Sequence, residues 1–140
     1  MHHSRTHGFT LIELLVVISI IGVLSSIVLA SLTNARSKGA DSAIKSNLNN
    51  IRSQAELSYD NGANGYQGAC TFGNNTDLYN AAKAAAGCGG ATCGACANST
   101  GAWSVWVQLK TVPADAWCVD YKGSAKTVSP KPAAPITSCP

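Results

Sequence analysis

The chain has several cysteines, which carry the most reactive type of side chain in it, and all of them lie beyond residue 69. The six cysteines are Cys70, Cys88, Cys93, Cys96, Cys118 and Cys139. An even number of cysteines in a small domain behind an apolar N-terminal segment predicts a disulfide framework. Small domains use such cross-links because burial alone leaves them marginally stable. The spacing leaves the pairing open, since six cysteines can pair in many ways.

Three of these cysteines also have a spacing known from metal sites. Cys88, Cys93 and Cys96 follow a C-x4-C-x2-C pattern, which is typical of plant-type iron–sulfur proteins. Cys93 and Cys96 alone would suit half of a zinc site or a redox pair. An exported domain rarely carries such a cluster, and no histidine lies near these residues in the sequence. We therefore expect disulfides and neither a metal nor a cofactor.

Glu13 is a second candidate for a functional role, because it is an acid in an apolar segment. The run from Phe9 to Leu32 has 24 residues with one acid, Glu13, no base and no proline. As a helix it would be about 36 Å long, enough for the hydrocarbon core of a membrane. An unpaired carboxylate in such a run costs a few kcal/mol, so Glu13 is a functional candidate. Solvation near the lipid headgroups is the alternative for Glu13.

Two simpler explanations of the apolar run remain open at this point. A secretory signal peptide would have a shorter apolar region followed by small residues, and Ala30-Ser31-Leu32 fits that pattern poorly. A plain N-terminal anchor would explain the length. Neither explains Glu13 together with the residues that precede it.

The residues from Gly8 to Ile18 read GFTLIELLVVI, and this stretch resembles the prepilin signature of type IV pilins and pseudopilins. The resemblance implies that a membrane-embedded aspartyl peptidase cuts between Gly8 and Phe9 and then N-methylates Phe9. It also implies that the leader, Met1–Gly8, stays on the cytoplasmic side.

Cleavage would give Glu13 a partner. It creates a charged amine on Phe9, and a buried cation needs a counter-charge. Glu13 of a neighbouring subunit would supply that charge and set the axial stagger, since fixing register is the best-attested use of buried ion pairs. Removing the leader also removes His2, His3 and His7, so no mature histidine remains for a catalytic triad. We therefore expect no enzyme.

The helix should continue beyond the apolar run as an amphipathic segment. One apolar stripe recurs at spacings of three and four: Ile44, Leu48, Ile51, Ala55 and Tyr59. The turn residues from Asp60 to Gly65 should end it. Residues 9–32 then form the transmembrane and assembly helix, and residues 33–60 its amphipathic continuation.

Residues 61–140 should form a globular, disulfide-rich head. A short helix is predicted at Thr76–Ala86, with Asn75 or Thr76 as cap and Gly87 at its end. Residues 103–109 and 117–122 alternate as half-buried strands, and Ala125–Val128 is a third strand. Four prolines make the tail a coil: Pro130, Pro132, Pro135 and Pro140. The expected class is α+β, a long N-terminal helix packed on a small antiparallel sheet, which is similar to the pilin fold.

Pilins commonly have a C-terminal loop closed by a disulfide, so the resemblance supports a Cys118–Cys139 bond. The other four cysteines, Cys70, Cys88, Cys93 and Cys96, are then expected to form two more bonds with the pairing open.

The predicted function is that of a structural subunit of a type IV pilus-like filament, with a homo-oligomeric helical filament, the prepilin peptidase and the pilus assembly machinery as partners. The subunit would cross the cytoplasmic membrane once, head outside, and then become part of an extracellular pilus. The alternatives are a minor tip pilin that binds DNA or a surface, and a type II secretion pseudopilin. After processing, nine Lys or Arg face seven acids, which is too small an excess to argue for nucleic acid. An exposed Trp106 with the head lysines would be the means of stacking on single-stranded DNA.

Overall fold

The computed structural model describes residues 8–61 and 64–140, so the leader residues Met1 to His7 and the turn residues Gly62 and Ala63 lie outside it. The longest element is α1, Leu11–Asp60, a helix of 50 residues. It contains no proline, and Asn61 closes its end by donating from both its backbone N–H and its side-chain amide to the carbonyl of Leu57, at 3.1 and 2.8 Å. The predicted helix over residues 9–60 is therefore confirmed, with its start shifted to Leu11.

The first compact unit of the chain ends at Ala35, and its helical portion is the apolar part of α1. This part is long and apolar enough to cross a membrane by length and composition, and none of its most apolar stretch is buried. Its hydroxyl groups bond within the helix: Ser19 donates to the carbonyl of Leu15 at 2.7 Å, and Ser26 to that of Val23 at 2.8 Å. These bonds satisfy side-chain donors that an apolar environment would leave unpaired.

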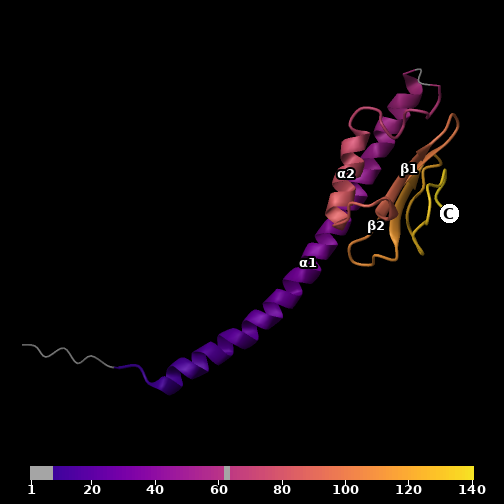
Figure 1. Cartoon of the computed structure of the whole chain (residues 1–140). Helices are drawn as coiled ribbons and strands as arrows, with labels where there is room; N and C mark the ends of the chain where they lie inside the picture. The colour runs from indigo at the N-terminus through magenta and orange to yellow at the C-terminus, as the bar shows by residue number, and fades with distance from the viewer. Residues whose placement is uncertain (1–7, 62–63) are drawn as a thin grey trace, which may run out of the picture. The chain divides into compact units, whose positions relative to one another are not determined.

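The second unit, residues 36–140, contains a four-stranded antiparallel sheet with the order β1-β2-β3-β4. Its strands are β1 (Gly94–Asn98), β2 (Trp103–Gln108), β3 (Ala116–Asp120) and β4 (Ala125–Val128). The helix α2, Asn75–Ala86, runs beside the second half of α1 (Figure 1). The predicted α+β class, a long helix on a small antiparallel sheet, is confirmed.

The main core lies between the two helices and one face of the sheet. The buried residues of this core are Ile44, Leu48, Ile51 and Ala55 of α1, Ala69, Ala82 and Ala86 around α2, and Trp103, Val105, Val107 and Val119 of the sheet. The predicted stripe of α1 is therefore its packing face, except at its last position. Tyr59 is 51% exposed, and Ser58 takes the inward place because a helix turn is 3.6 residues rather than four.

The other face of the sheet is covered by the C-terminal segment, which the alternating pattern did not anticipate. Trp106, Ala116, Cys118 and Val128 form a second buried cluster, with Ile136 and Cys139 packed against it. Strand β2 is consequently buried on both faces, and the expectation of half-buried strands was wrong for it. Figure 1 shows the C-terminal segment, in yellow, beyond the sheet.

Sequence reasoning also missed strand β1 and the short 3-10 helix η1, Ala91–Cys93, which precedes it. The strand sequence Gly-Ala-Cys-Ala-Asn is poor in β-branched and aromatic residues, so propensity gave no signal. Its pairing with β2, which sets Cys96 opposite Val105, supplies the stabilisation that its own residues lack. For α2 the prediction is one residue short at its start, and Gly87 ends the helix in the left-handed conformation at φ 75° as expected.

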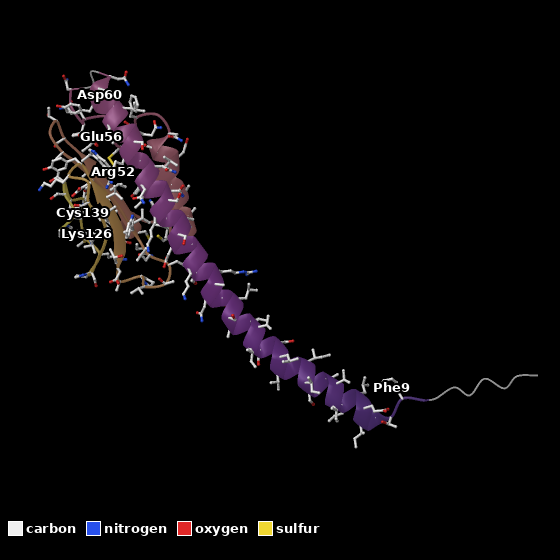
Figure 2. The ribbon with its side chains drawn as sticks, turned by 180° about the vertical axis from the view of Figure 1, so that it is seen from behind. Phe9, Arg52, Glu56, Asp60, Lys126 and Cys139 are labelled. Atoms are coloured by element: carbon white, nitrogen blue, oxygen red, sulfur yellow. A yellow bond between two sulfur atoms is a disulfide. The ribbon has the colours of Figure 1, made fainter. Side chains whose placement is uncertain are left out.

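Two buried carboxylates and one arginine fasten the loops of the head. Asp41 of α1 accepts hydrogen bonds from the backbone N–H groups of Lys110 and Thr111, at 2.6 and 3.3 Å. Asp120 accepts from the turn after β3 and from the backbone N–H of Cys139 at 2.8 Å. Arg52 donates to the carbonyl of Ser124 at 2.7 Å, from the face of α1 seen in Figure 2.

Candidate processing and assembly site

The peptide bond between Gly8 and Phe9 lies in an irregular segment that ends where α1 begins. The Phe9 side chain is 82% exposed, and it projects from the start of the helix in Figure 2. A Cβ atom built on Gly8 would meet no other atom within 4 Å. A peptidase needs an extended, accessible backbone, and both residues that flank this bond are accessible.

Thr10 and Glu13 form a capping box at the start of α1. The backbone N–H and the hydroxyl of Thr10 donate to Oε2 of Glu13, at 2.9 and 2.8 Å, and the backbone N–H of Glu13 donates to the Thr10 hydroxyl at 3.2 Å. This reciprocal pattern satisfies donors that a helix start leaves without partners. The Thr-x-x-Glu spacing in the sequence is a signal of this cap.

The capping box uses only one oxygen of the Glu13 carboxylate. Among the residues that the structure describes, the second oxygen, Oε1, accepts no hydrogen bond. An ionised carboxylate has about four lone-pair sites for donors. Glu13 can therefore cap its own helix and still accept a cation from another molecule.

The helix surface around and beyond Glu13 is apolar and open on all sides. Fifteen of its large side chains from Leu11 to Leu32 are between 46% and 81% exposed: Leu11, Ile12, Leu14, Leu15, Val16, Val17, Ile18, Ile20, Ile21, Val23, Leu24, Ile27, Val28, Leu29 and Leu32. Gly22 also has nothing within 4 Å of its missing Cβ, so a neighbouring helix could approach closely there. An apolar surface of this extent requires lipid or other apolar helices to cover it.

Two disulfides cross-link the head. One joins Cys118 to Cys139, as the resemblance implied, and the other joins Cys70 to Cys96. Cys88 and Cys93 remain as thiols, so one of the two further bonds expected among these four cysteines is present. Because Cys96 is bonded to Cys70, the C-x4-C-x2-C spacing does not assemble as an iron–sulfur ligand set. Within residues 8–61 and 64–140, no group of three His, Cys, Asp or Glu residues is placed to hold a metal.

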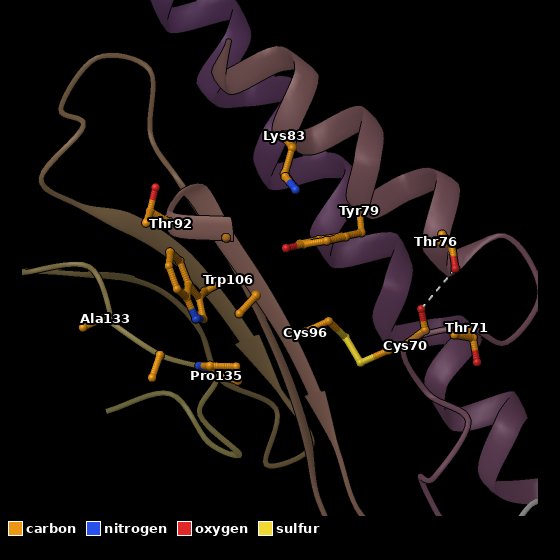
Figure 3. Close-up of a pocket in the computed structure, with 13 residues that line it drawn as sticks. Cys70, Thr71, Thr76, Tyr79, Lys83, Thr92, Cys96, Trp106, Ala133 and Pro135 are labelled. Carbon is orange, nitrogen blue, oxygen red and sulfur yellow. Dashed lines mark hydrogen bonds between the residues drawn. A yellow bond between two sulfur atoms is a disulfide. The ribbon is translucent and has the colours of Figure 1, made fainter. Parts of the chain in front are cut away.

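A cavity of about 600 Å³ lies between α2, the start of β1 and the C-terminal segment (Figure 3). Tyr79 and Lys83 of α2 line one wall, and the Lys83 ammonium lies 5.2 Å from the centroid of the Tyr79 ring. Trp106 lines the cavity too, but its side chain is only 1% exposed. The expectation of an exposed Trp106 that stacks on nucleic acid was therefore wrong, because the C-terminal segment covers the indole.

The N-terminal residues of the chain match a known family model. Residues 3–29 match the family model described as the prokaryotic N-terminal methylation motif. This motif is the signature of type IV pilins and pseudopilins, and the chain carries it at the position where the structure has the open Gly8–Phe9 bond, the capping box and the bare apolar helix.

The chain therefore carries the N-terminal signature of type IV pilins and pseudopilins, on a long apolar helix that continues onto a four-stranded antiparallel sheet. Searches of curated proteins and of solved structures found no match to the chain.

Proposed function

We propose that the chain is a structural subunit of a type IV pilus-like filament, cut between Gly8 and Phe9, N-methylated on Phe9 and assembled through residues 9–32. The observation that carries the proposal is the methylation motif at residues 3–29 together with an apolar helix surface that no other described residue covers. A bundle of such helices would bury that surface, and burial of apolar area is the main driving force of association.

The precursor would cross the cytoplasmic membrane once, with Met1–Gly8 on the cytoplasmic side and the head outside. Two disulfides in the head support this orientation, since disulfides persist in oxidising compartments. The prepilin peptidase and the assembly machinery would act on this form, and the finished filament would be extracellular. Residues 33–60 would connect the helical filament core to the head, residues 61–140.

Glu13 would pair with the Phe9 amine of an adjacent subunit. The unbonded Oε1 atom of its carboxylate supports this role, because the capping box and the ion pair can coexist. A buried pair of this kind adds little net stability, but it penalises every stagger in which a charge is left alone. The pair would therefore select the axial rise of the filament.

Mass spectrometry of the mature N-terminus tests the proposal most directly. The expected species begins at Phe9 and carries one added methyl group. Gly8→Val should leave the precursor uncut, because a branched side chain obstructs the extended backbone in the protease cleft. Gly39→Ala is the matched control, since Gly39 also has open space around its Cβ position but lies far along α1. A chain that still begins at Met1 in pili-producing cells, or one cut near Ala30, would refute the proposal.

The cavity beside Tyr79 and Lys83 favours a second candidate, a minor pilin at the filament tip that binds a surface or a small ligand. A type II secretion pseudopilin is the structurally related third. Shearing of surface filaments separates them: a major pilin dominates the sheared fraction, a tip pilin is a trace component, and a pseudopilin stays with the cell envelope. Salt-dependent binding of DNA would support the tip-pilin candidate.

A further inference from the structure

The two thiols left over from the disulfide framework lie against each other. Cys88 follows Gly87, the residue that ends α2, and its backbone N–H donates to the carbonyl of Lys83 at 3.2 Å. Cys93 ends η1, and its backbone N–H donates to the carbonyl of Gly90 at 3.4 Å. Only four residues separate the two cysteines in the sequence, and the Cys93 side chain lies close enough to the Cys88 thiol to affect its ionisation.

Both thiols are withdrawn from solvent. Cys93 is 8% exposed, and the half-buried Cys88 packs against the main core. Burial and the contact with Cys93 raise the pKa of Cys88 to about 11. Cysteines used for catalysis or redox sensing have a lowered pKa and an accessible sulfur, so Cys88, with its raised pKa, and the buried Cys93 each lack a property of a reactive thiol.

We propose that Cys88 and Cys93 are joined by a third disulfide in the mature head. A disulfide requires its two Cα atoms to be roughly 4.4–6.8 Å apart. Cys88 and Cys93 are neighbours at the junction of α2 and η1, and they are the two cysteines outside the Cys70–Cys96 and Cys118–Cys139 bonds. Metal binding is the other use of adjacent thiols, and the part of the chain that the structure describes offers them no third ligand. The bond would fasten the end of α2 to the residue before β1, at the wall of the cavity.

The oxidant would be the disulfide of an oxidised protein dithiol outside the cytoplasm. The thiolate of one cysteine attacks that disulfide and forms a mixed disulfide, with one sulfur of the oxidant leaving as a thiolate. The second cysteine then attacks the mixed disulfide, the Cys88–Cys93 bond forms, and the oxidant departs as a dithiol. Two electrons and two protons pass from the pair to the oxidant.

The inference rests on the proposed export of the head, and differential alkylation tests the two separately. Full-length protein, purified from membranes in detergent, is denatured and alkylated with N-ethylmaleimide, then reduced and alkylated with iodoacetamide. Tandem mass spectrometry assigns the label on each cysteine. We expect the iodoacetamide label on all six cysteines.

The two single variants supply the matched controls. In Cys88→Ser, Cys93 should take the maleimide label while the four other cysteines stay protected, and Cys93→Ser should give the converse at Cys88. Maleimide on both Cys88 and Cys93 of the unmodified sequence, with the other four protected, overturns the third bond and leaves export intact. Maleimide on all six overturns the bond and the export of the head together. A protected Cys93 in Cys88→Ser overturns this pairing in favour of another.

Discussion

Oε2 of Glu13 accepts hydrogen bonds from both the backbone N–H and the hydroxyl of Thr10, at 2.9 and 2.8 Å. The conspicuous acid of the apolar run therefore has a role within its own chain, because it caps α1 directly after the Gly8–Phe9 bond. Any test of its proposed role between subunits must separate pairing with an amine from capping of the helix.

Thr10→Val and Glu13→Leu make that separation. Thr10→Val removes both hydrogen bonds of the Thr10 hydroxyl but keeps the carboxylate, so it should weaken the helix start by about 0.5–2 kcal/mol and still give filaments. Glu13→Leu removes the carboxylate, while the backbone N–H of residue 13 can still donate to the Thr10 hydroxyl, so it should abolish assembly while cleavage at Gly8 continues. The yield of sheared filaments and the mature N-terminus are the two measurements. Equal loss of filaments in both variants would show that the cap, and not an ion pair, matters; normal filaments from Glu13→Leu would contradict the registry role.

Much of this organisation could be predicted from the sequence because strong local signals carry it. The uninterrupted apolar run predicts the first half of α1, the stripe from Ile44 to Ala55 predicts its packing face, and Gly87 predicts the end of α2. The third predicted strand has the same bounds as β4, Ala125–Val128. In each case the residues that give the signal also make the structure.

The missed features depend on parts of the chain that are distant in sequence. Strand β1 exists because β2 pairs with it, and its own residues have low strand propensity. Trp106 was expected on an exposed face because its neighbours alternate, yet Ile136 and Cys139 cover that face. Alternation of apolar and polar residues indicates that a strand has two different faces. It does not indicate whether a later segment of the chain covers the second face.

We expect replacement of the Asp41 side chain to lower the stability of the head strongly. It is 8% exposed, and it accepts two backbone N–H groups of the loop after β2 as well as the Thr111 hydroxyl. Asp41→Ala leaves those buried donors without acceptors, so we expect a loss of about 1–3 kcal/mol in the free energy of unfolding. Denaturant unfolding followed by tryptophan fluorescence measures it. Asp115→Asn is the control, because the Asp115 side chain makes no hydrogen bond in the described structure; equal losses would contradict the anchoring role.

We expect the ionisation of Tyr66 to lower the stability of the head at high pH. Burial, followed by its hydrogen bond to Glu56, raises its pKa from 10.0 to about 12. A phenol whose pKa is higher in the folded state keeps its proton better there than in the unfolded chain. Its contribution to stability is therefore complete below pH 10 and is lost as the pH rises from 10 to about 12.

Tyr66→Phe should remove this part of the pH dependence, and Glu56→Gln should reduce it by removing the neighbouring charge. Ultraviolet absorbance of the phenolate during a pH titration follows the group directly. Asp60→Asn is a suitable control, since Asp60 is the smallest of the contributors to the shift. A titration curve that Glu56→Gln leaves unchanged would rule out Glu56 as a cause.

The Cys118–Cys139 disulfide holds the segment that covers Trp106, and Cys70–Cys96 offers a matched comparison. The two bonds have similar sequence separations, 21 and 26, so the chain-entropy model assigns each about 3 kcal/mol. Replacing both cysteines of either pair with serine should therefore lower stability by similar amounts.

Only the Cys118→Ser/Cys139→Ser variant should release the C-terminal segment from the sheet, because of the two disulfides only Cys118–Cys139 joins this segment to β3. Under native conditions its tryptophan emission should shift to longer wavelength and become accessible to a quencher such as iodide, whereas the Cys70→Ser/Cys96→Ser variant should keep Trp106 protected. If both variants expose tryptophan equally, the cover over Trp106 depends on the whole head rather than on this bond.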